Sequence, residues 1–332
     1  MNILLTGGAG YIGACTALFI LKLNPNFKCI IIDKEETQNI KKLQILFPNN
    51  IKFYKIDMCR MDLLETVFND TKVDGVIHFA AYTIVSESEK ETYKYFHNNI
   101  NSTLNLLELM KKYAVSNLIF SSSASVYGVA EYLPIDEDHP LKPVSTYAIS
   151  KKICEDLILK YSERGINYVI LRYFNPAGAI DGIGEEHNPE THLIPLLIRS
   201  MLEGNIFKIF GNDFPTPDGT CIRDFIHIED LANAHFLSLR KLLGEEIKNE
   251  IFNVGINNGY SVMEVVLKAI EMFKGKVNKN FRYIIDSRRE GDVPALVAKA
   301  NKIKNKLGFY PKYTIEDILQ SVWNYESQKI ST

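Results

Sequence analysis

Short, mostly hydrophobic runs recur through the first half of the chain, separated by segments long enough for helices. Each run is nearly continuous rather than alternating with polar residues, as expected of strands covered on both faces. Strands and helices in alternation predict a parallel sheet between two layers of helices. The predicted strands cover residues 1–6, 29–33, 53–57, 73–81, 117–122 and 168–174, and the predicted helices include 103–113 and 149–161.

The pattern changes after residue 174. A loop rich in Gly, Pro and Glu covers 175–190, and long irregular connections within a compact domain are often functional. We predict an α/β protein with a doubly wound, parallel-sheet Rossmann domain over 1–175, to which a segment near 225–245 returns. A smaller α/β domain is expected over 176–332. Its predicted helices are 193–202, 230–239, 262–273 and 315–325, and its strands are 207–210, 225–228, 251–254 and 281–285.

Composition narrows the class of protein without indicating its chemistry. The 332 residues are 46% hydrophobic and carry a formal net charge of -2, which fits a globular chain and argues against nucleic-acid binding. No apolar run reaches the roughly 18 residues that span a bilayer, and a basic leader segment is missing. The five cysteines are scattered without C-x-x-C spacing, so neither a disulfide framework nor a metal site is expected. We expect a soluble, cytoplasmic protein.

A glycine-rich turn follows the first predicted strand and opens a helix. The sequence Gly-Gly-Ala-Gly-Tyr-Ile-Gly places Gly7, Gly10 and Gly13 at the spacing of a dinucleotide-binding turn. Glycines there permit a tight turn and close approach of a diphosphate to backbone amides at the helix N-terminus. A surface turn is the alternative, which the strand-turn-helix context makes the weaker interpretation.

An acidic residue, Asp33, ends the second strand twenty positions after Gly13. A carboxylate there binds a ribose 2′-hydroxyl and repels a 2′-phosphate. Glu35 and Glu36 strengthen that repulsion, so NAD is expected rather than NADP, and Lys34 is the one nearby residue that opposes this preference.

Two further strand ends are candidates for the cofactor site. Asp57 either accepts from the adenine amino group or caps a helix, and the sequence leaves both open. Phe79, Ala80 and Ala81 follow the fourth strand, and small residues there would let a cofactor lie across the sheet edge. Core packing explains Phe79 equally well.

A phenol and an ammonium, Tyr147 and Lys151, stand four residues apart and so share one helix face. Ser123 lies at the end of the fifth strand, at the sheet edge where ligands bind in open α/β folds. Tyr325 and Lys329 have the same spacing in the last helix, and we interpret them as a solvated surface pair. A Lys cation and a positively charged nicotinamide would lower the tyrosine pKa, so that Tyr147 could accept a hydroxyl proton while a hydride leaves the same carbon.

These motifs resemble those of the UDP-glucose 4-epimerases, in the extended short-chain dehydrogenase/reductase superfamily. The similarity extends over essentially the whole chain, and the Gly-Asn-Asp, Asp-Gly-Thr and Arg-Arg-Glu-Gly-Asp stretches carry its most specific part. The matching segments are 6–13, 120–128, 147–151, 171–176, 211–213, 218–220, 223–227 and 288–292.

The resemblance implies a tightly held NAD that is reduced and reoxidised within one turnover, with a UDP-sugar as substrate. It makes Tyr147 the base at the sugar 4-hydroxyl, assisted by Lys151 and Ser123. It also implies cofactor contacts from Tyr11, Ile12, Met58, Val85, Asn98 and Phe174, and substrate contacts from Asn175, His192, Leu193, Lys208, Ile209, Phe210, Arg223, Arg289 and Asp292, with Arg288 as a companion.

Three positions depart from the family pattern. Thr83 stands where some members carry a lysine that reaches the NAD phosphates, and His192 stands where some have asparagine. Leu296 occupies the position that gates the sugar pocket, where a bulky aromatic favours plain hexoses. We hypothesise that Leu296 admits N-acetylated UDP-sugars as well as UDP-glucose and UDP-galactose.

Other functions on the same fold remain open. A nucleotide-sugar dehydratase needs an Asp-Glu pair after the residue at Ser123, and here Ala124 and Ser125 follow. A decarboxylase, another nucleotide-sugar epimerase and a non-catalytic NAD-binding protein are further alternatives. The family commonly forms homodimers through two long helices, which here would be 92–113 and 149–161, whereas packing on their own sheet alone is the other interpretation.

Overall fold

The structure is a computed structural model that describes residues 1–289 and 291–331. Glu290, within the Arg-Arg-Glu-Gly-Asp stretch, and Thr332, the last residue of the predicted second domain, lie outside the described residues. Within the described part, no helix is long and apolar enough to cross a membrane.

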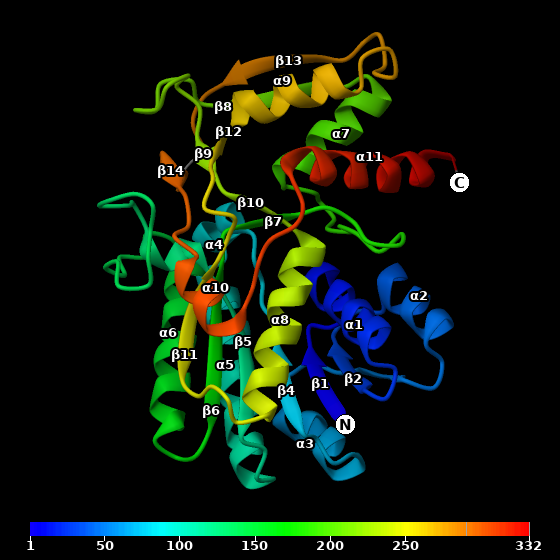
Figure 1. The fold of residues 1–332 in the computed structure, drawn as a ribbon, viewed down its shortest axis with the longest axis vertical. Coiled ribbons are helices and arrows are strands. Elements are labelled where there is room, and N and C mark those ends of the chain that lie inside the picture. The colour runs from blue at the N-terminus through cyan, green and yellow to red at the C-terminus, as the bar shows by residue number, and fades with distance from the viewer. Residues whose placement is uncertain (290, 332) are drawn as a thin grey trace.

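Seven strands of the described chain form one wholly parallel sheet in the order β11-β6-β5-β4-β1-β2-β3 (Figure 1). The order reverses direction between β1 and β4, which is the topological switch point where open α/β sheets bind ligands. The strands are β1 (Asn2–Thr6), β2 (Lys28–Asp33), β3 (Ile51–Lys55), β4 (Gly75–His78), β5 (Asn117–Ser123), β6 (Asn167–Tyr173) and β11 (Glu250–Val254).

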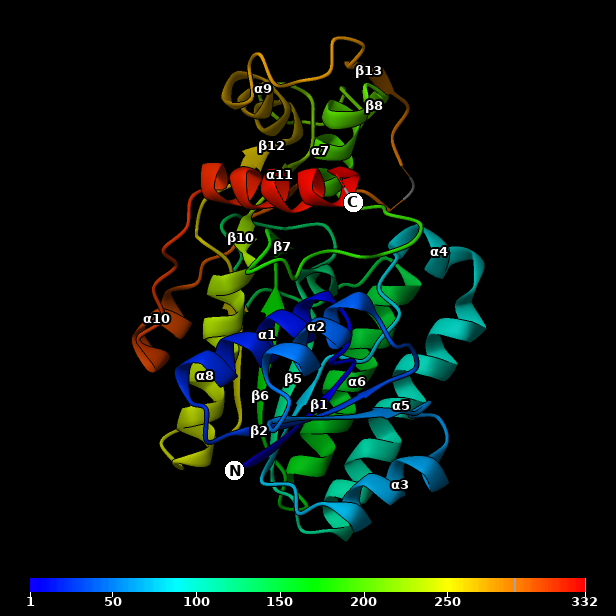
Figure 2. The ribbon, with the colours of Figure 1, turned by 90° about the vertical axis from the view of Figure 1, so that its right-hand side faces the viewer.

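Helices cover both faces of this sheet, as a continuous apolar strand requires. One face packs on α1 (Tyr11–Leu23), α2 (Gln38–Leu46) and α8 (Ile228–Leu243), and the other packs on α3 (Met61–Asp70), α5 (Thr92–Lys112) and α6 (Thr146–Ser162). Figure 2 shows α5 and α6 lying side by side along the outer face. Short helix α4 (Val85–Lys90) precedes α5, and α10 (Asn301–Leu307) packs beside β11.

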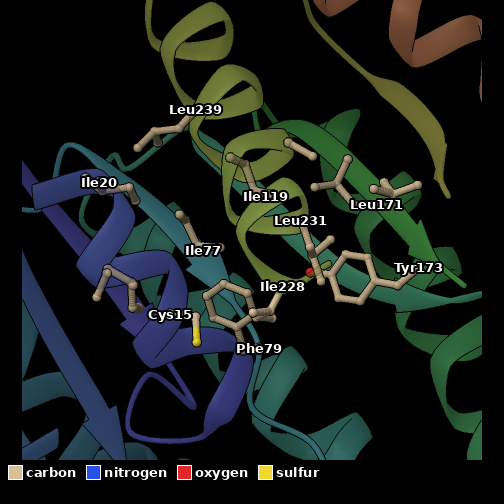
Figure 3. Close-up of a cluster of buried hydrophobic side chains, with 14 of the residues drawn as sticks. Cys15, Ile20, Ile77, Phe79, Ile119, Leu171, Tyr173, Ile228, Leu231 and Leu239 are labelled. Atoms are coloured by element: carbon tan, nitrogen blue, oxygen red, sulfur yellow. The ribbon is translucent and has the colours of Figure 1, made fainter. Parts of the chain in front are cut away.

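The core on the α1 side is built from segments that lie far apart in the sequence. Cys15 and Ile20 of α1 face Leu231 and Leu239 of α8 across the strand residue Ile77 (Figure 3). These side chains are at most 1% exposed, and full burial of a large aliphatic side chain stabilises the fold by about 1.5–3 kcal/mol. The helix α8 therefore completes the first layer although it follows β6 by more than fifty residues.

A smaller layer lies above the carboxyl edge of the sheet (Figure 1). Its apolar residues form a third core, which includes Leu197, Val266 and Leu319. The C-terminal helix α11 packs on α7 and α9 and closes this layer. The elements are β7 (Asn175–Ala177), α7 (Leu193–Glu203), β8 (Ile206–Phe210), β9 (Ile222–Arg223), β10 (Phe225–His227), β12 (Tyr260–Ser261), α9 (Val262–Met272), β13 (Arg282–Asp286), β14 (Ala295–Leu296) and α11 (Ile315–Ser331), and the 3-10 helix η1 (Ala124–Tyr127) follows β5.

The α/β class and the doubly wound sheet are confirmed, but several local predictions were wrong. The strand predicted at 53–57 ends at Lys55, so Asp57 lies beyond it. The return to the sheet extends to Val254, because β11 pairs with β6 at the sheet edge. Tyr325 of α11, predicted to be solvated, is 7% exposed and packs against the loop at Gly184 and Glu186.

Candidate active site

A cavity of about 890 Å³ lies between the carboxyl edge of the sheet and the smaller layer. Its size is near the upper end of the range for ligand pockets, about 300–1,000 Å³. The switch point, the end of β5 and the N-terminus of α6 line its lower wall, whereas β8, β9, α7 and β14 line its upper wall. The cavity thus spans the boundary between the two layers.

The glycine-rich turn forms the floor of the cavity. Gly7 has φ +67°, and a Cβ there would lie 2.6 Å from the amide nitrogen of Ala80. A Cβ on Gly13 would lie 2.6 Å from the Gly7 carbonyl oxygen, so only glycine allows α1 to pack this closely on the turn. Gly10 is the N-cap of α1, which leaves backbone amides at the helix N-terminus for a diphosphate.

Asp33 lies at the end of β2 beside this turn, and its carboxylate accepts from the Ala9 amide at 3.2 Å. Burial raises its pKa, whereas backbone amide donors oppose that change. The fit to an adenosine ribose is good, because a carboxylate faces the cavity next to the turn that receives the diphosphate.

Lys34 lines the cavity and pairs with two predicted cofactor residues. Its ammonium donates to the Asn98 side chain at 2.6 Å and lies 3.3 Å from the Asp57 carboxylate. Asp57 accepts from the Cys59 amide at 2.8 Å and is not among the residues that line the cavity. It does not cap α3 either, since that helix begins after Arg60.

The predicted catalytic residues meet on the lower wall. Tyr147 stands in the first turn of α6, which begins after Ser145, and the Ser145 hydroxyl accepts from the Ala148 amide at 3.2 Å. One turn later, the Lys151 ammonium donates to the Ser121 carbonyl oxygen at 2.7 Å. Ser123 ends β5, and its hydroxyl donates to the Ser125 hydroxyl at 3.0 Å and opposes the rise in the pKa of Tyr147. Strand and helix thus bring the three side chains to one end of the sheet.

Burial sets the acidity of this group in the protein itself. The pKa of Tyr147 is raised to about 12 by burial, which outweighs the hydrogen bond from Ser123. The pKa of Lys151 is lowered to about 8, also by burial. The predicted lowering of the tyrosine pKa is therefore not reproduced by the protein alone. Desolvation disfavours both charged forms, the tyrosinate and the ammonium, and so moves the two pKa values apart, from 10.0 and 10.5 to about 12 and about 8.

A buried ion pair joins helix α6 to strand β6 beneath the predicted catalytic residues. Glu155 of α6 binds Arg172 of β6 through two hydrogen bonds of 3.0 and 2.7 Å, and both side chains are at most 3% exposed. The same carboxylate accepts from the Ser122 hydroxyl at 2.5 Å, and Arg172 donates to the Tyr127 hydroxyl at 3.0 Å. Satisfied buried networks rigidify the elements that they join.

The upper wall carries two arginines around one carboxylate. Arg223 lies 3.6 Å from Asp292 and donates to the Val293 carbonyl at 2.8 Å. Arg289 donates to Asp292 at 3.1 Å and lies 4.9 Å from the centroid of the Phe210 ring. Planar guanidinium groups held in this way suit diphosphate oxygens.

Arg288, the predicted companion, points elsewhere. Its guanidinium donates to the Asp213 carboxylate at 2.6 Å and stacks 4.1 Å from the Phe214 ring centroid. It does not line the cavity. Alternate residues of strand β8 face opposite sides. Lys208 and Phe210 line the cavity, whereas the Ile209 side chain is fully buried in the third core.

Three comparisons with known proteins agree with this geometry. The NAD dependent epimerase/dehydratase family matches residues 3–255. A UDP-glucose 4-epimerase of Lactobacillus helveticus is 39% identical over 331 residues, which is 98% of this chain and 97% of the relative. The chain belongs to the NAD dependent epimerase/dehydratase family.

Solved members of the family have the same fold over their full length. The crystal structure of UDP-glucose 4-epimerase from Bifidobacterium longum in complex with NAD+ and UDP has a TM-score of 0.92 and 33% identity, and the match covers 99% of both chains. The UDP-Glc/GlcNAc 4-epimerase from Campylobacter jejuni has a TM-score of 0.82 and 34% identity, with 98% of this chain and 99% of that chain covered. The resemblance inferred from the motifs is confirmed.

The cavity brings together nearly all of the residues that the family pattern predicts, with Asp57, Ile209 and Arg288 as the exceptions. Their roles remain predictions. The predicted residues that line it are Gly7, Gly10, Tyr11, Ile12, Gly13, Asp33, Met58, Phe79, Ala80, Ala81, Val85, Asn98, Ser123, Tyr147, Lys151, Phe174, Asn175, His192, Leu193, Lys208, Phe210, Arg223, Arg289, Asp292 and Leu296.

Sequence reasoning missed other polar residues of the cavity wall. Lys94 pairs with Glu87 at 2.7 Å and lies 4.5 Å from the Tyr82 ring centroid. Glu185 and His187 come from the loop that precedes α7. That loop was recognised as irregular, but its alternating acidic and histidine residues were the signal that could have singled out these two side chains.

Proposed function

We propose that this protein interconverts UDP-glucose and UDP-galactose by transient oxidation at the sugar C4 carbon, with NAD as a tightly bound cofactor. The observation that carries the proposal is the convergence of Tyr147, Lys151 and Ser123 in the same cavity as Arg223 and Arg289. Bound NAD would accept the C4 hydride and return it to the opposite face of the sugar. The relatives named above support this activity.

The protein's own residues handle the proton and the position of the sugar. Tyr147 takes the proton of the sugar 4-hydroxyl and later returns it, while the Ser123 hydroxyl binds the same oxygen. The Lys151 ammonium, anchored on Ser121, favours the tyrosinate by its positive charge. Bound NAD+ would supply a further positive charge that favours the tyrosinate, and Tyr147, with a pKa of about 12 in the protein alone, would need that help to act as a base.

The upper wall holds the nucleotide. Arg223 and Arg289 bind the diphosphate, and Asp292 orients both guanidinium groups or accepts from a ribose hydroxyl. Asn175 reaches the sugar or a phosphate from β7, and Lys208 and Phe210 border the uracil. Asn98, on α5, contacts the cofactor. An enzyme that rotates its intermediate needs firm anchoring of the nucleotide and few contacts with the sugar.

The decisive experiment uses the purified full chain without added cofactor. We expect the denatured protein to release NAD and the native protein to equilibrate UDP-glucose with UDP-galactose. Formation of a 4-keto-6-deoxy sugar would instead indicate a dehydratase, and release of CO₂ from a UDP-uronic acid would indicate a decarboxylase. Nucleotide release without turnover of any UDP-sugar would identify a non-catalytic NAD-binding protein.

A second activity, on N-acetylated UDP-sugars, follows from Leu296. This side chain lines the cavity from β14, where it pairs with Arg223 of β9. Leucine leaves more room beside the sugar than a bulky aromatic would. Assaying UDP-glucose, UDP-galactose, UDP-GlcNAc and UDP-GalNAc side by side tests this proposal, and no turnover of the last two would overturn it.

We propose that two copies associate through α5 and α6, as the family pattern implies. These helices lie side by side and expose Ile149 and Leu159, which are 37% and 40% accessible. Light scattering should report a dimer that Leu159→Lys weakens.

We also propose a cofactor domain over 1–175 with a returning segment, and a substrate domain over 176–332. We propose a cytoplasmic location as well, which the five free thiols support.

A further inference from the structure

The loop between β7 and α7 carries a cluster of side chains that have no part in the proposed proton and hydride transfer, although one of them, His192, is a predicted substrate contact. The cluster comprises Glu185, His187 and His192, whose potential ligand atoms all lie within 4.8 Å of one another. The loop is anchored to both layers, since the Asn39 side chain donates to the Gly184 carbonyl at 2.9 Å and Lys329 donates to the Glu185 carbonyl at 3.0 Å. The cluster is therefore part of a braced segment.

The carboxylate lies between the two imidazoles. Glu185 Oε1 lies 2.5 Å from His187 Nδ1, and Oε2 lies 3.6 Å from His192 Nδ1. The ring centroids of the two histidines are 5.3 Å apart. The Glu185 side chain is 8% exposed, whereas the imidazoles are 40% and 44% exposed. A small ion can thus approach from the cavity, which all three residues line.

The surrounding groups already orient the carboxylate. Glu185 Oε1 accepts from the backbone amides of Glu186 and His187 at 3.0 and 3.3 Å. On the other side, Glu190 Oε1 lies 2.8 Å from His192 Nδ1. Outer partners of this kind orient the ligands of metal sites and raise their affinity.

A second observation is a buried carboxylate oxygen beside the cluster that has no hydrogen-bond partner among the described residues. The Glu190 side chain is 3% exposed, and within the described chain its Oε2 atom is buried without a hydrogen-bond partner. The nearest cation, Arg199, lies 3.6 Å away and forms two hydrogen bonds with Glu326. A buried oxygen without a hydrogen bond is costly, and Glu190 Oε2 is therefore a position that a further ligand could occupy.

We propose that Glu185, His187 and His192 bind a divalent transition metal ion such as Zn²⁺ or Co²⁺, with Glu190 as an outer partner or fourth ligand. Two imidazoles and one carboxylate are the protein ligands of a known class of zinc site, in which water or substrate takes the fourth coordination position. Nitrogen ligands favour transition metals over Mg²⁺ or Ca²⁺. A bound ion would displace the proton shared by the His187 and Glu185 side chains, while His192 would bind the ion through Nε2 if Nδ1 keeps its hydrogen bond to Glu190. This site differs from the sequence-based expectation that no metal site is present.

The test uses the untagged full chain with its bound nucleotide, treated with a chelator, dialysed and titrated with Co²⁺. We expect one Co²⁺ per chain with visible ligand-field absorption, displacement of that ion by Zn²⁺, and a melting temperature that rises with metal concentration. X-ray absorption should report two imidazole ligands, a measurement that requires no variant. These readouts are independent of epimerase activity, so the proposal stands or falls separately from the proposed function.

Matched variants localise the ion. His187→Asn should weaken Co²⁺ binding at least about tenfold, and Glu185→Gln should do the same, with circular dichroism checking the fold. His97→Asn is the control, because His97 is exposed on α5, away from the cluster. No stoichiometric binding by the wild type, or equal binding by the His187 and His97 variants, would overturn the proposal.

Discussion

The two walls of the cavity hold their polar groups in different ways. On the sheet side, Tyr147 and Lys151 are at most 8% exposed and rest on a buried ion pair between Glu155 and Arg172. On the upper side, Arg289 is nearly half exposed and is held by Asp292 from a loop and short strands. The buried residues are thus held rigidly where we propose that a proton moves, and the exposed arginine is free to adjust where we propose that a nucleotide binds.

The largest expected effect is on the sheet side. Tyr147→Phe removes the group that accepts the sugar proton, so kcat should fall by about 10²–10⁴-fold while NAD remains bound. Tyr325→Phe is the matched control, since Tyr325 has a lysine at the same spacing. We expect kcat to change by about threefold at most, because this variant loses only one weak hydrogen bond outside the cavity. Equal activity of the Tyr147 variant and the wild type would refute the proposed base.

The next largest effect is on the stability of the fold and comes from the buried pair Glu155 and Arg172 beneath that wall. Glu155→Gln leaves Arg172 buried without its charge partner, and breaking such a pair costs about 3–5 kcal/mol of unfolding free energy. Urea denaturation measures the loss. Glu163→Gln, which breaks the exposed pair with Lys160, should cost less than about 1 kcal/mol. Similar losses from both variants would remove the proposed contrast between buried and exposed pairs.

The upper wall should affect binding more than chemistry. Arg289→Ala should raise KM about 10–100-fold with little change in kcat, because a charge-assisted hydrogen bond contributes about 1.5–3 kcal/mol. Arg288→Ala is the control, since Arg288 binds Asp213 and lies outside the cavity lining. Steady-state kinetics with UDP-glucose distinguish the two, and a larger KM effect for the Arg288 variant would contradict the geometry.

The burial of Lys151 predicts a pH-dependent stability difference. Its pKa falls from 10.5 to about 8 on folding, so below pH 8 the fold must hold a desolvated ammonium. Lys151→Met should therefore make the nucleotide-free protein more stable by about 2 kcal/mol below pH 8, allowing for a lost hydrogen bond. Between pH 8 and 10.5, the unfolded wild type holds the Lys151 proton and the folded wild type does not. The unfolding free energy of the wild type therefore rises with pH in this window, and the difference in stability between the variant and the wild type becomes smaller.

Denaturation of both proteins at pH 7 and pH 10 measures that gap. A gap that widens with pH, or a variant that is less stable at pH 7, would mean that the contact with Ser121 outweighs desolvation.

The smallest expected effect concerns sugar selectivity. Leu296→Tyr should lower kcat/KM for UDP-GlcNAc about tenfold through lost space, while UDP-glucose changes by about twofold or less. Competition between the two substrates in one reaction measures the ratio directly. An equal loss for both sugars would show that Leu296 does not gate the acetyl group.

The sequence by itself determined the features that depend on local spacing. The glycines at 7, 10 and 13 and Asp33 at the next strand end identified the fold and the cofactor class, because strand and helix geometry fix where such residues point. The helical pair Tyr147 and Lys151 gave the prediction of the catalytic group. The matching motifs extended this prediction to the upper wall.

Only the tertiary structure decided the properties that depend on neighbours distant in the chain. It turned Arg289 into the cavity and Arg288 toward Asp213, and it buried Tyr325, which the sequence suggested was solvated. It also raised the pKa of Tyr147, since burial outweighs a single hydrogen bond. Desolvation and charge pairing arise from the packing of separate segments, so no local pattern encodes them.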